Sequence, residues 1–284
     1  MYSTVPLPVR LWISFWNWPI SGTSLSGPVG PGGGASSSAT SIGAPGLGGA
    51  VLLSAGTGLA ATLLSFAIAL WFCAAWHGTR TFSAFRRLLA PLLALPHAAF
   101  AIGLAFLMAP SGWIVRLLSP WATGWTFPPD LALVNDPWGL ALVLGLMVKE
   151  VPFLMLMVVA ALGQTPADKA LTVARSMGYG PVTAWLKVVL PLVYAQVRLP
   201  VYAVLAFSLS VVDVALILGP GTPPPLAVLV LRWFTDPDLA LRYQAAAGAC
   251  LQLVLVAAMI ALWRLAEVAA GRASRGWLVS GRRG

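Results

Sequence analysis

Four ionisable side chains stand inside stretches of the sequence that are otherwise apolar. Lys149 and Glu150 are adjacent and precede Pro152, Asp213 lies between "LSVV" and "VALILG", and His97 follows Pro96 within another apolar run. A charged group in hydrocarbon is costly, and such groups commonly mark the route of a solute or ion through a membrane. These four residues are therefore the candidate pathway residues of the chain.

Each of the four also has a structural alternative. Lys149 and Glu150 can neutralise one another or a neighbouring helix, and His97 can be a hydrogen-bonded packing residue. Asp213 can cap a broken helix or pair with Arg198 or Lys149. If Asp213 instead lines a pathway as an anion, it should favour a positively charged solute such as an amine.

The sequence offers no enzyme or metal site beside these residues. His77 and His97 lie apart, without the H-E-x-x-H or Cys-His spacing of a metal centre, and no serine stands in a G-x-S-x-G turn. We therefore expect no catalytic residues, no metal and no cofactor.

The composition is that of a membrane protein. Of the 284 residues, 59% are hydrophobic and 9% are charged, which leaves too little polar surface for a soluble globule. A transmembrane helix needs about 20 apolar residues, and five runs meet this length: 50–76, 88–108, 138–162, 192–218 and 245–266. The predicted fold class is an all-α polytopic membrane protein with five transmembrane helices.

The two ends of the chain differ from this apolar middle. Residues 11–20, "LWISFWNWPI", are too few to cross a membrane and rich in Trp, which predicts an interfacial helix or a truncated first span. Residues 27–49 are rich in Gly, Ser and Pro and are expected to form a mobile linker. Residues 1–49 are predicted to be the interfacial or truncated N-terminal segment and its linker. Residues 50–266 are predicted to be the transmembrane domain, and residues 267–284 a basic cytoplasmic tail.

Lys and Arg residues predict the orientation in the membrane. They gather near 80–87, near 169–187 and in the tail from Arg272, so these parts should face the cytoplasm and the N-terminus the outside, provided that 11–20 does not cross. This rule accounts for most of the formal charge of +9. Because the cations lie beside membrane spans, we expect the chain to contact membrane lipid and not to bind nucleic acid.

A polar segment, "ARSMGYGPVTAWLKVVLP" at 174–191, interrupts the apolar pattern and predicts two short helices joined by a sharp turn. Thr165 is expected to cap the first helix, with Pro166 opening it and Asp168 near its positive end. Gly178 or Gly180 can adopt the left-handed conformation that ends a helix, and Pro181 can open the next one.

Small residues on the first of these helices suggest a docking face. Ala174 and Gly178 are four residues apart and so share one face of a helix, where neither would keep another surface at a distance. The alternative is an amphipathic loop that lies on the lipid headgroups.

This segment resembles the signature loop of the inner-membrane permeases of type I binding-protein-dependent ABC importers. The pattern of that loop is E-A-A, three residues, G, nine residues, I, one residue, L-P. In this chain Ala174, Gly178, Val188, Leu190 and Pro191 stand at the matching positions. The resemblance extends to "LPHAAFAIGLAFLMAP", "KEVPFLMLM" and "LSVVDVALILGP", so it covers roughly 52–265.

The chain departs from the family pattern at two positions of the loop. Thr172 replaces the glutamate, and Val173 replaces the first alanine. A charge contact made by that glutamate in the family is therefore absent here or is made by other residues, such as Arg175 or Asp168.

The resemblance implies one permease half in a bacterial inner membrane, crossing it several times, with helices that line a solute pathway. The loop at 163–191 would dock into a cytoplasmic ABC ATPase dimer. The remaining implied partners are a second permease half, identical or different, and a periplasmic or extracellular solute-binding protein. The expected ATPase-coupling residues are Thr172, Ala174, Arg175, Gly178, Leu190 and Pro191.

Two further features of the sequence bear on the mechanism. The chain lacks a G-x-x-x-x-G-K-[ST] phosphate loop, so ATP hydrolysis would belong to a separate subunit.

The alternative function is a subunit of an ion-gradient-driven secondary transporter. For such a protein we would expect an internal repeat with paired broken helices, and no convincing repeat is found. A membrane anchor would leave the charges inside the spans unexplained.

Overall fold

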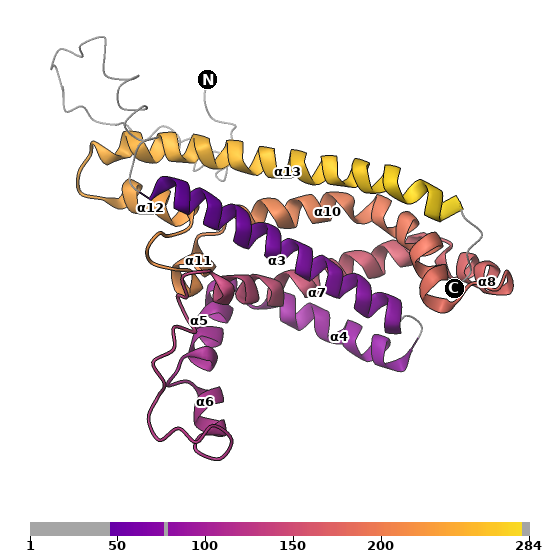
Figure 1. Cartoon of the computed structure of the whole chain (residues 1–284), viewed down its shortest axis with the longest axis horizontal. Helices are drawn as coiled ribbons and strands as arrows, with labels where there is room; N and C mark the ends of the chain where they lie inside the picture. The colour runs from indigo at the N-terminus through magenta and orange to yellow at the C-terminus, as the bar shows by residue number, and fades with distance from the viewer. Residues whose placement is uncertain (1–45, 77–78, 280–284) are drawn as a thin grey trace, which may run out of the picture. The chain divides into compact units, whose positions relative to one another are not determined.

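The computed structural model describes residues 46–76 and 79–279, all of which belong to the second of two compact units, Ser37–Gly284. The segment predicted at 11–20, His77 and most of the linker predicted at 27–49 lie outside the described residues. The described part is helical, without strands (Figure 1).

Five helices in the described ranges are long and apolar enough to cross a membrane, as the sequence predicts. They are Leu47–Trp76, His97–Leu118, Leu140–Gln164, Val182–Ser210 and Leu241–Ser274. The first is α3 (Leu47–Trp76), which packs against α7 (Leu140–Gln164) and α10 (Leu190–Ser210).

Close approach between α3 and α10 depends on small side chains. A Cβ atom added at Gly58 would lie only 2.8 Å from a methyl carbon of Leu209, so a larger residue at this position would push the two helices apart. Membrane helices commonly pack through small residues in this way, because lipid provides no hydrophobic force to drive association.

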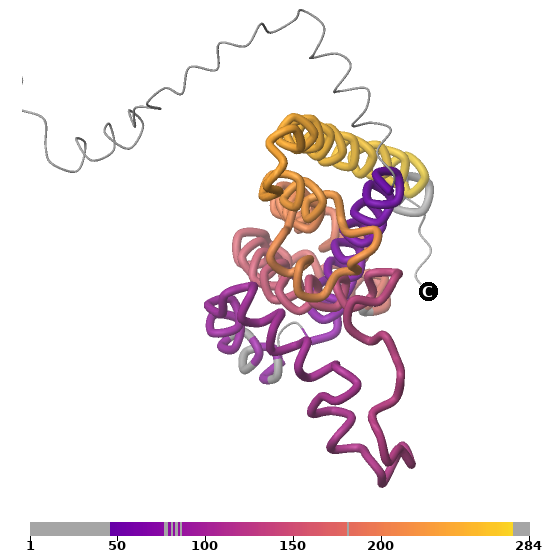
Figure 2. The backbone as a smooth tube through the Cα atoms, turned by 90° about the vertical axis from the view of Figure 1, so that its left-hand side faces the viewer, coloured from indigo at the N-terminus to yellow at the C-terminus, as the bar shows by residue number. Residues whose placement is uncertain are grey.

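The longest helix is α13 (Leu241–Val279), which lies along α10 and also contacts α3 and α12 (Leu226–Thr235) (Figures 1 and 2). It passes without interruption through position 266, where the sequence placed the boundary between the transmembrane domain and a basic tail. The residues of that tail up to Val279 therefore continue a helix.

The second predicted span, 88–108, is wrong as a single helix. The structure has α4 (Arg80–Ala94) and α5 (His97–Met108), followed by α6 (Trp113–Leu118), and α5 turns away from the direction of α4 (Figure 1). The break falls at Pro96, which has no backbone N–H to continue the helix ladder. Hydropathy does not detect this break, because both sides of it are apolar.

The fourth predicted span, 192–218, is also broken. Helix α10 ends at Ser210, and α11 (Asp213–Leu218) follows. Side chains from elsewhere bind the carbonyl groups that the two helix ends leave free: Gln252 Nε2 donates to Leu209 O at 3.0 Å, and Asn135 Nδ2 donates to Gly219 O at 2.6 Å. Such partners are needed where a helix ends at membrane depth.

The polar segment near 174–191 forms the expected helix, turn and helix. Helix α8 (Ala167–Ser176) is followed by Gly178 at φ 83° and by α9, which begins at Pro181 (Pro181–Ala184). The π-helical turn η1 (Trp185–Val189) then leads directly into α10. The left-handed glycine and the new start at Pro181 are confirmed.

The predicted cap of the first helix is wrong. Thr165 ends α7 instead, and its hydroxyl donates backwards to Ala161 O at 3.0 Å. Pro166 takes the N-cap position of α8, and Asp168 lies in its first turn. The Thr165 hydroxyl therefore satisfies the end of one helix and leaves the start of the next without a side-chain cap.

Figure 1 shows α8, the start of α4 and the C-terminal end of α13 at one end of the helices. The opposite end carries α11, α12 and the start of α13. The three regions where Lys and Arg gather in the sequence thus lie on the same side, as the predicted orientation requires.

Candidate functional site

Three of the four candidate pathway residues line one cavity, which lies between the α4–α5 break, α7 and α10. Its volume is about 220 Å³, far more than a single water molecule needs. The remaining lining is almost entirely apolar. The lining residues are Leu93, His97, Lys149, Glu150, Phe153, Ala203, Val204 and Phe207.

The ammonium group of Lys149 binds the free end of α4. Its Nζ donates to the carbonyl oxygens of Leu92, Leu93 and Leu95 at 2.6 to 3.3 Å. A helix end leaves its last carbonyls without backbone partners and carries a partial negative charge, so a cation there is favourable. Lys149 therefore compensates for the helix break before Pro96.

Glu150 points to a different set of partners, although it is the next residue along α7. Its Oε1 accepts a hydrogen bond from the Ser208 hydroxyl of α10, and its side chain is 3% exposed. The same hydroxyl oxygen lies 2.8 Å from Val204 O, one turn earlier in α10, and 3.4 Å from the Thr62 hydroxyl of α3. The two neighbouring charges thus serve different helices, and they do not form the mutual pair considered from the sequence.

His97 packs at the aromatic edge of the cavity. Its ring centroid lies 5.0 Å from that of Phe207, with the two planes inclined by 50°. His97 belongs to α5 and Phe207 to α10, so the contact joins the two helices across the cavity mouth.

Asp213 does not belong to this cavity. It is exposed in the first turn of α11, just past the end of α10. Lys149, which the sequence offered as a partner for Asp213, is bound to the α4 carbonyls instead. The predicted cap is wrong: Val212 takes the N-cap position of α11 and no side-chain hydrogen bond caps this helix.

The 163–191 loop brings the expected coupling residues to the end of the helices. Ala167, Leu171 and Ala174 of α8 are buried in a cluster with Trp185, Val189 and Val193. The shared face predicted for Ala174 and Gly178 is therefore wrong: Ala174 is 4% exposed and points inward, and Gly178 lies beyond the end of α8.

The outer face of α8 carries different residues. Thr172 and Arg175 are exposed, as are the apolar side chains of Val173 and Met177. Leu190 is half-buried and Pro191 exposed where η1 passes into α10. Because a proline ring clashes with the carbonyl four residues earlier, the wider π turn before Pro191 lets the helix continue through it.

A groove of about 510 Å³ runs beside this face. Lys187 lies over the Tyr179 ring, with Nζ 5.3 Å from the ring centroid, at one side of the groove. The lining residues are Pro166, Lys169, Ala170, Val173, Ala174, Met177, Tyr179, Lys187 and Val188.

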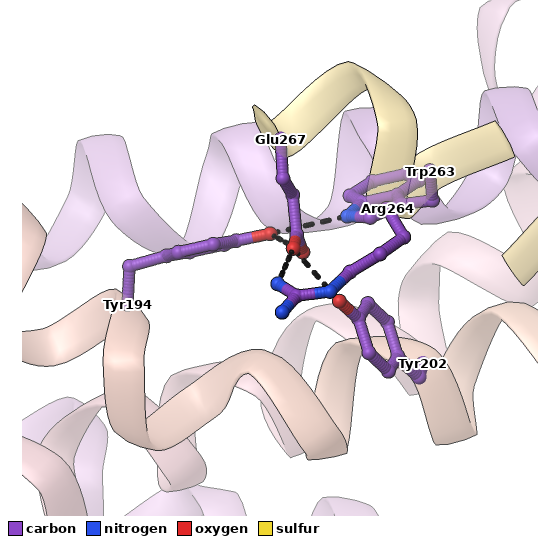
Figure 3. Close-up of polar contacts among 5 residues, drawn as sticks. All are labelled: Tyr194, Tyr202, Trp263, Arg264 and Glu267. Carbon is purple, nitrogen blue, oxygen red and sulfur yellow. Dashed lines mark hydrogen bonds and ion pairs between the residues drawn. The ribbon is translucent and has the colours of Figure 1, made fainter. Parts of the chain in front are cut away.

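A polar cluster that was not predicted from the sequence joins α10 and α13 (Figure 3). Glu267 accepts hydrogen bonds from Tyr194 and Tyr202 of α10 and pairs with Arg264 at 2.7 Å. Trp263 Nε1 donates to the Tyr194 hydroxyl at 3.1 Å. We call these five residues the α10–α13 cluster.

A signal for the cluster exists in the sequence. Tyr194 and Tyr202 are eight residues apart and so share one helix face, and Trp263 and Glu267 are four apart. Ending the last span at 266 placed Glu267 in the tail, where a charge needs no partner.

Comparisons with known proteins add one result. No family model matches the chain. It is 37% identical over 177 residues to "Inner membrane ABC transporter permease protein YnjC" of Escherichia coli (strain K12), a match that covers 61% of this chain and 33% of that protein. The chain thus spans about a third of the length of this curated relative. The similarity supports the resemblance to ABC transporter permeases and, together with the five apolar helices, a multi-pass inner-membrane protein.

Proposed function

We propose that this chain is a permease subunit of an ATP-driven ABC importer, which forms part of the solute pathway and couples to a separate ATPase through the 163–191 loop. The observation that carries the proposal is the position of α8, a short helix between the two long apolar helices α7 and α10. Similarity to an ABC permease over 177 residues supports it independently.

The packing of α8 against α10 suggests how a displacement of the 163–191 loop would be transmitted to the cavity. Helix α8 is buried against η1 and the start of α10, and α10 carries Val204 and Phe207 at the cavity. A closely packed core does not deform continuously, so a displacement of α8 should move α10 as a rigid body. The loop and the cavity would then change together.

The exposed face of α8 suggests the chemistry of its partner. Thr172 stands at the position of the family glutamate, while Lys169 and Arg175 are exposed nearby with Val173 and Met177. An ATPase groove that receives this face should be apolar at its centre and acidic at its rim. Charge complementarity of this kind governs which partner is accepted.

A second permease half would complete the transporter. The match covers a third of the curated relative, so about 360 residues of that relative lie outside it, more than the length of this chain. That length can accommodate a second half in the same polypeptide. The remaining proposed partners are a second permease half, identical or different, and a solute-binding protein on the outer side.

The test is a pair of glycine substitutions in the turn. Gly178→Val places a β-branched residue at φ 83°, which strains the turn between α8 and α9. Gly180→Val is the matched control, because a Cβ atom there meets nothing within 4 Å and residues before proline tolerate extended backbone.

We expect the Gly178→Val chain to insert in the membrane but to lose copurification with the ATPase subunit of its transporter and the stimulation of ATP hydrolysis by solute. The Gly180→Val chain should retain both. Unchanged association and stimulation in the Gly178→Val complex would contradict the coupling role. Uptake that persists without ATP under an ion gradient would instead favour a secondary transporter.

A further inference from the structure

Residues 109–129, which comprise α6 and the loop that follows it, form an arm that extends away from the other helices. We call these residues the outer arm. Figure 1 shows α5 and α6 running across the direction of α3 and α7, and Figure 2 shows the same segment leaving the bundle in a view turned by 90°. The arm lies towards the end that carries α11 and α12, which is the outer end in the predicted orientation. Because α3 and α7 cross the membrane, a segment that runs across them lies along it, although hydropathy alone would let 97–118 span it.

The composition of the outer arm does not suit a segment surrounded by water. Arg116 is its single charged residue, and no residue of α6 is buried. The side chains of Trp113, Leu117, Trp121 and Phe127 are all largely exposed. A continuous apolar surface of this kind is unfavourable in water and marks a site of contact with a partner or a membrane.

A second loop at the same end of the helices shows what a water-facing segment of this protein looks like. Between α12 and α13 the chain carries Asp236 and Asp238, and each carboxylate accepts a hydrogen bond from a nearby backbone N–H. The outer arm has no acidic residue and instead contains Trp113, Trp121 and Trp125. Tryptophan joins an apolar ring to an N–H donor and is enriched where membrane meets water. The contrast favours lipid around the outer arm.

A pocket of about 420 Å³ in the outer arm contains its one cation. Arg116 Nε donates to Ser111 O at 2.8 Å, which leaves the two terminal nitrogens of the guanidinium without a partner among the described residues. Trp125 and Phe127 line the same pocket. A guanidinium can bind two oxygens of a phosphate through parallel N–H groups. The pocket therefore places a phosphate-binding group beside aromatic surface.

We propose that the outer arm lies in the outer membrane–water interface, where the Arg116 pocket binds the phosphate of an anionic phospholipid and Trp113, Leu117 and Phe127 contact the surrounding lipid. This inference goes beyond the proposed function, because the arm belongs neither to the coupling loop nor to the cavity. It holds whether or not the chain couples to an ATPase. A protein subunit that covered the arm would instead exclude lipid from it.

The experiment compares three leucines that are similarly exposed in the structure but should meet different surroundings. Leu117 of the outer arm is 69% exposed, Leu253 within α13 is 71% exposed and Leu239 in the loop before α13 is 62% exposed. The variants Leu117→Cys, Leu253→Cys and Leu239→Cys are made in a chain that also carries Cys73→Ala and Cys250→Ala. Each full chain, with the subunits that copurify with it, is labelled with a nitrobenzoxadiazole fluorophore and placed in lipid nanodiscs.

Three quenchers then report the surroundings of each label. A phospholipid with a nitroxide close to its headgroup quenches at shallow depth, one with a nitroxide near the end of its acyl chain quenches at the bilayer centre, and iodide quenches from water. We expect the shallow lipid to quench the Leu117 label about twofold more than the deep lipid does, and the Leu253 label to show the reverse. Iodide should quench the Leu239 label strongly and the Leu117 label weakly.

Three results would overturn the interfacial position. Quenching of the Leu117 label by iodide as strongly as that of the Leu239 label would put the outer arm in water. Stronger quenching by the deep lipid than by the shallow one would mean that the arm enters the bilayer centre. Protection of the Leu117 label from all three quenchers would mean that a protein subunit covers the arm.

Substitution of the arginine tests the phosphate contact. With the shallow nitroxide on phosphatidylglycerol, quenching of the Leu117 label should be about twofold stronger than with the same nitroxide on phosphatidylcholine, because the anionic lipid gathers at a cation. Arg116→Gln should abolish this preference. The matched control is Arg242→Gln, which removes another exposed arginine at the same end and should retain it. A preference that is absent from the original chain, or that survives Arg116→Gln, would contradict the Arg116 site.

Discussion

Two glutamates near α10 differ in how completely their oxygens are satisfied. Glu267, on α13, accepts from two tyrosine hydroxyls and pairs with Arg264, whereas Glu150, on α7, accepts from Ser208 and leaves Oε2 without a partner among the described residues. Satisfied polar networks stabilise and orient the helices that they join. We infer that the α10–α13 cluster stabilises the packing of α10 against α13.

The comparison also explains why the more exposed glutamate is the better satisfied one. The side chain of Glu267 is 11% exposed and lies on the last helix, within reach of three donors on two helices. Glu150 lies deeper, where the Ser208 hydroxyl donates to it and the Ser65 side chain also lies beside it. Burying a carboxylate at this depth is costly, so a contact between two helices does not by itself account for Glu150.

The largest expected effect follows from Glu267→Ala. It removes the acceptor of two tyrosine hydroxyls, each worth about 1 kcal/mol net, whereas the exposed pair with Arg264 adds little, so the free energy of unfolding should fall by about 2 kcal/mol. Thermal unfolding in detergent, followed by the fluorescence of Trp263 and the other tryptophans, measures this change. A stability equal to that of the original chain would show that the α10–α13 cluster is not structural.

A smaller effect is expected from the two tyrosines of the α10–α13 cluster. Tyr194→Phe should lower the free energy of unfolding by about 1–2 kcal/mol and Tyr202→Phe by about 1 kcal/mol. The difference arises because the Tyr194 hydroxyl also accepts from Trp263 Nε1, which would lose its partner. The same unfolding measurement orders the two variants, and the reverse order would contradict the geometry in Figure 3.

Glu150→Gln should behave in the opposite way. Because it removes a buried charge and retains an oxygen that can accept from Ser208, the free energy of unfolding should change by less than about 0.5 kcal/mol or should increase. A loss of about 2 kcal/mol or more, comparable to that of Glu267→Ala, would make Glu150 a structural residue and remove the contrast between the two glutamates.

Arg264→Gln is expected to have the smallest effect. Half of the Arg264 side chain is exposed, so its pair with Glu267 is weakened by solvent and by salt. Unfolding curves of the variant and the original chain should nearly coincide at high salt and differ slightly at low salt. A large loss of stability at every salt concentration would mean that Arg264, rather than the tyrosines, holds the α10–α13 cluster together.

Part of the candidate site was predictable from the sequence. The sequence indicated three of the cavity residues, His97, Lys149 and Glu150, because each interrupts an apolar run. Asp213 attracted attention for the same reason but lies elsewhere, since hydropathy detects a polar residue in a span without indicating the direction in which it points. The α10–α13 cluster was missed because its members look ordinary near the end of a helix.

The helix breaks show a second limit of the same kind. Pro96 is a visible signal, but a proline within a membrane helix can produce either a kink or an end. The outcome depends on whether another element binds the freed carbonyls, and here Lys149 does so from a position more than fifty residues away. At the end of α10 the partner is Gln252, and no proline marks the break.

The sequence by itself determined that five apolar stretches are long enough to cross a membrane, that the chain turns near Gly178 and Gly180 and which residues are costly to bury, because these properties depend on local composition and backbone preference. Only the tertiary structure decided that Lys149 and Glu150 serve different helices, that Ala174 faces inward and that Glu267 is satisfied. Those outcomes depend on hydrogen-bond partners that are distant in the sequence, and a buried polar group acquires its role from the partner it finds or lacks.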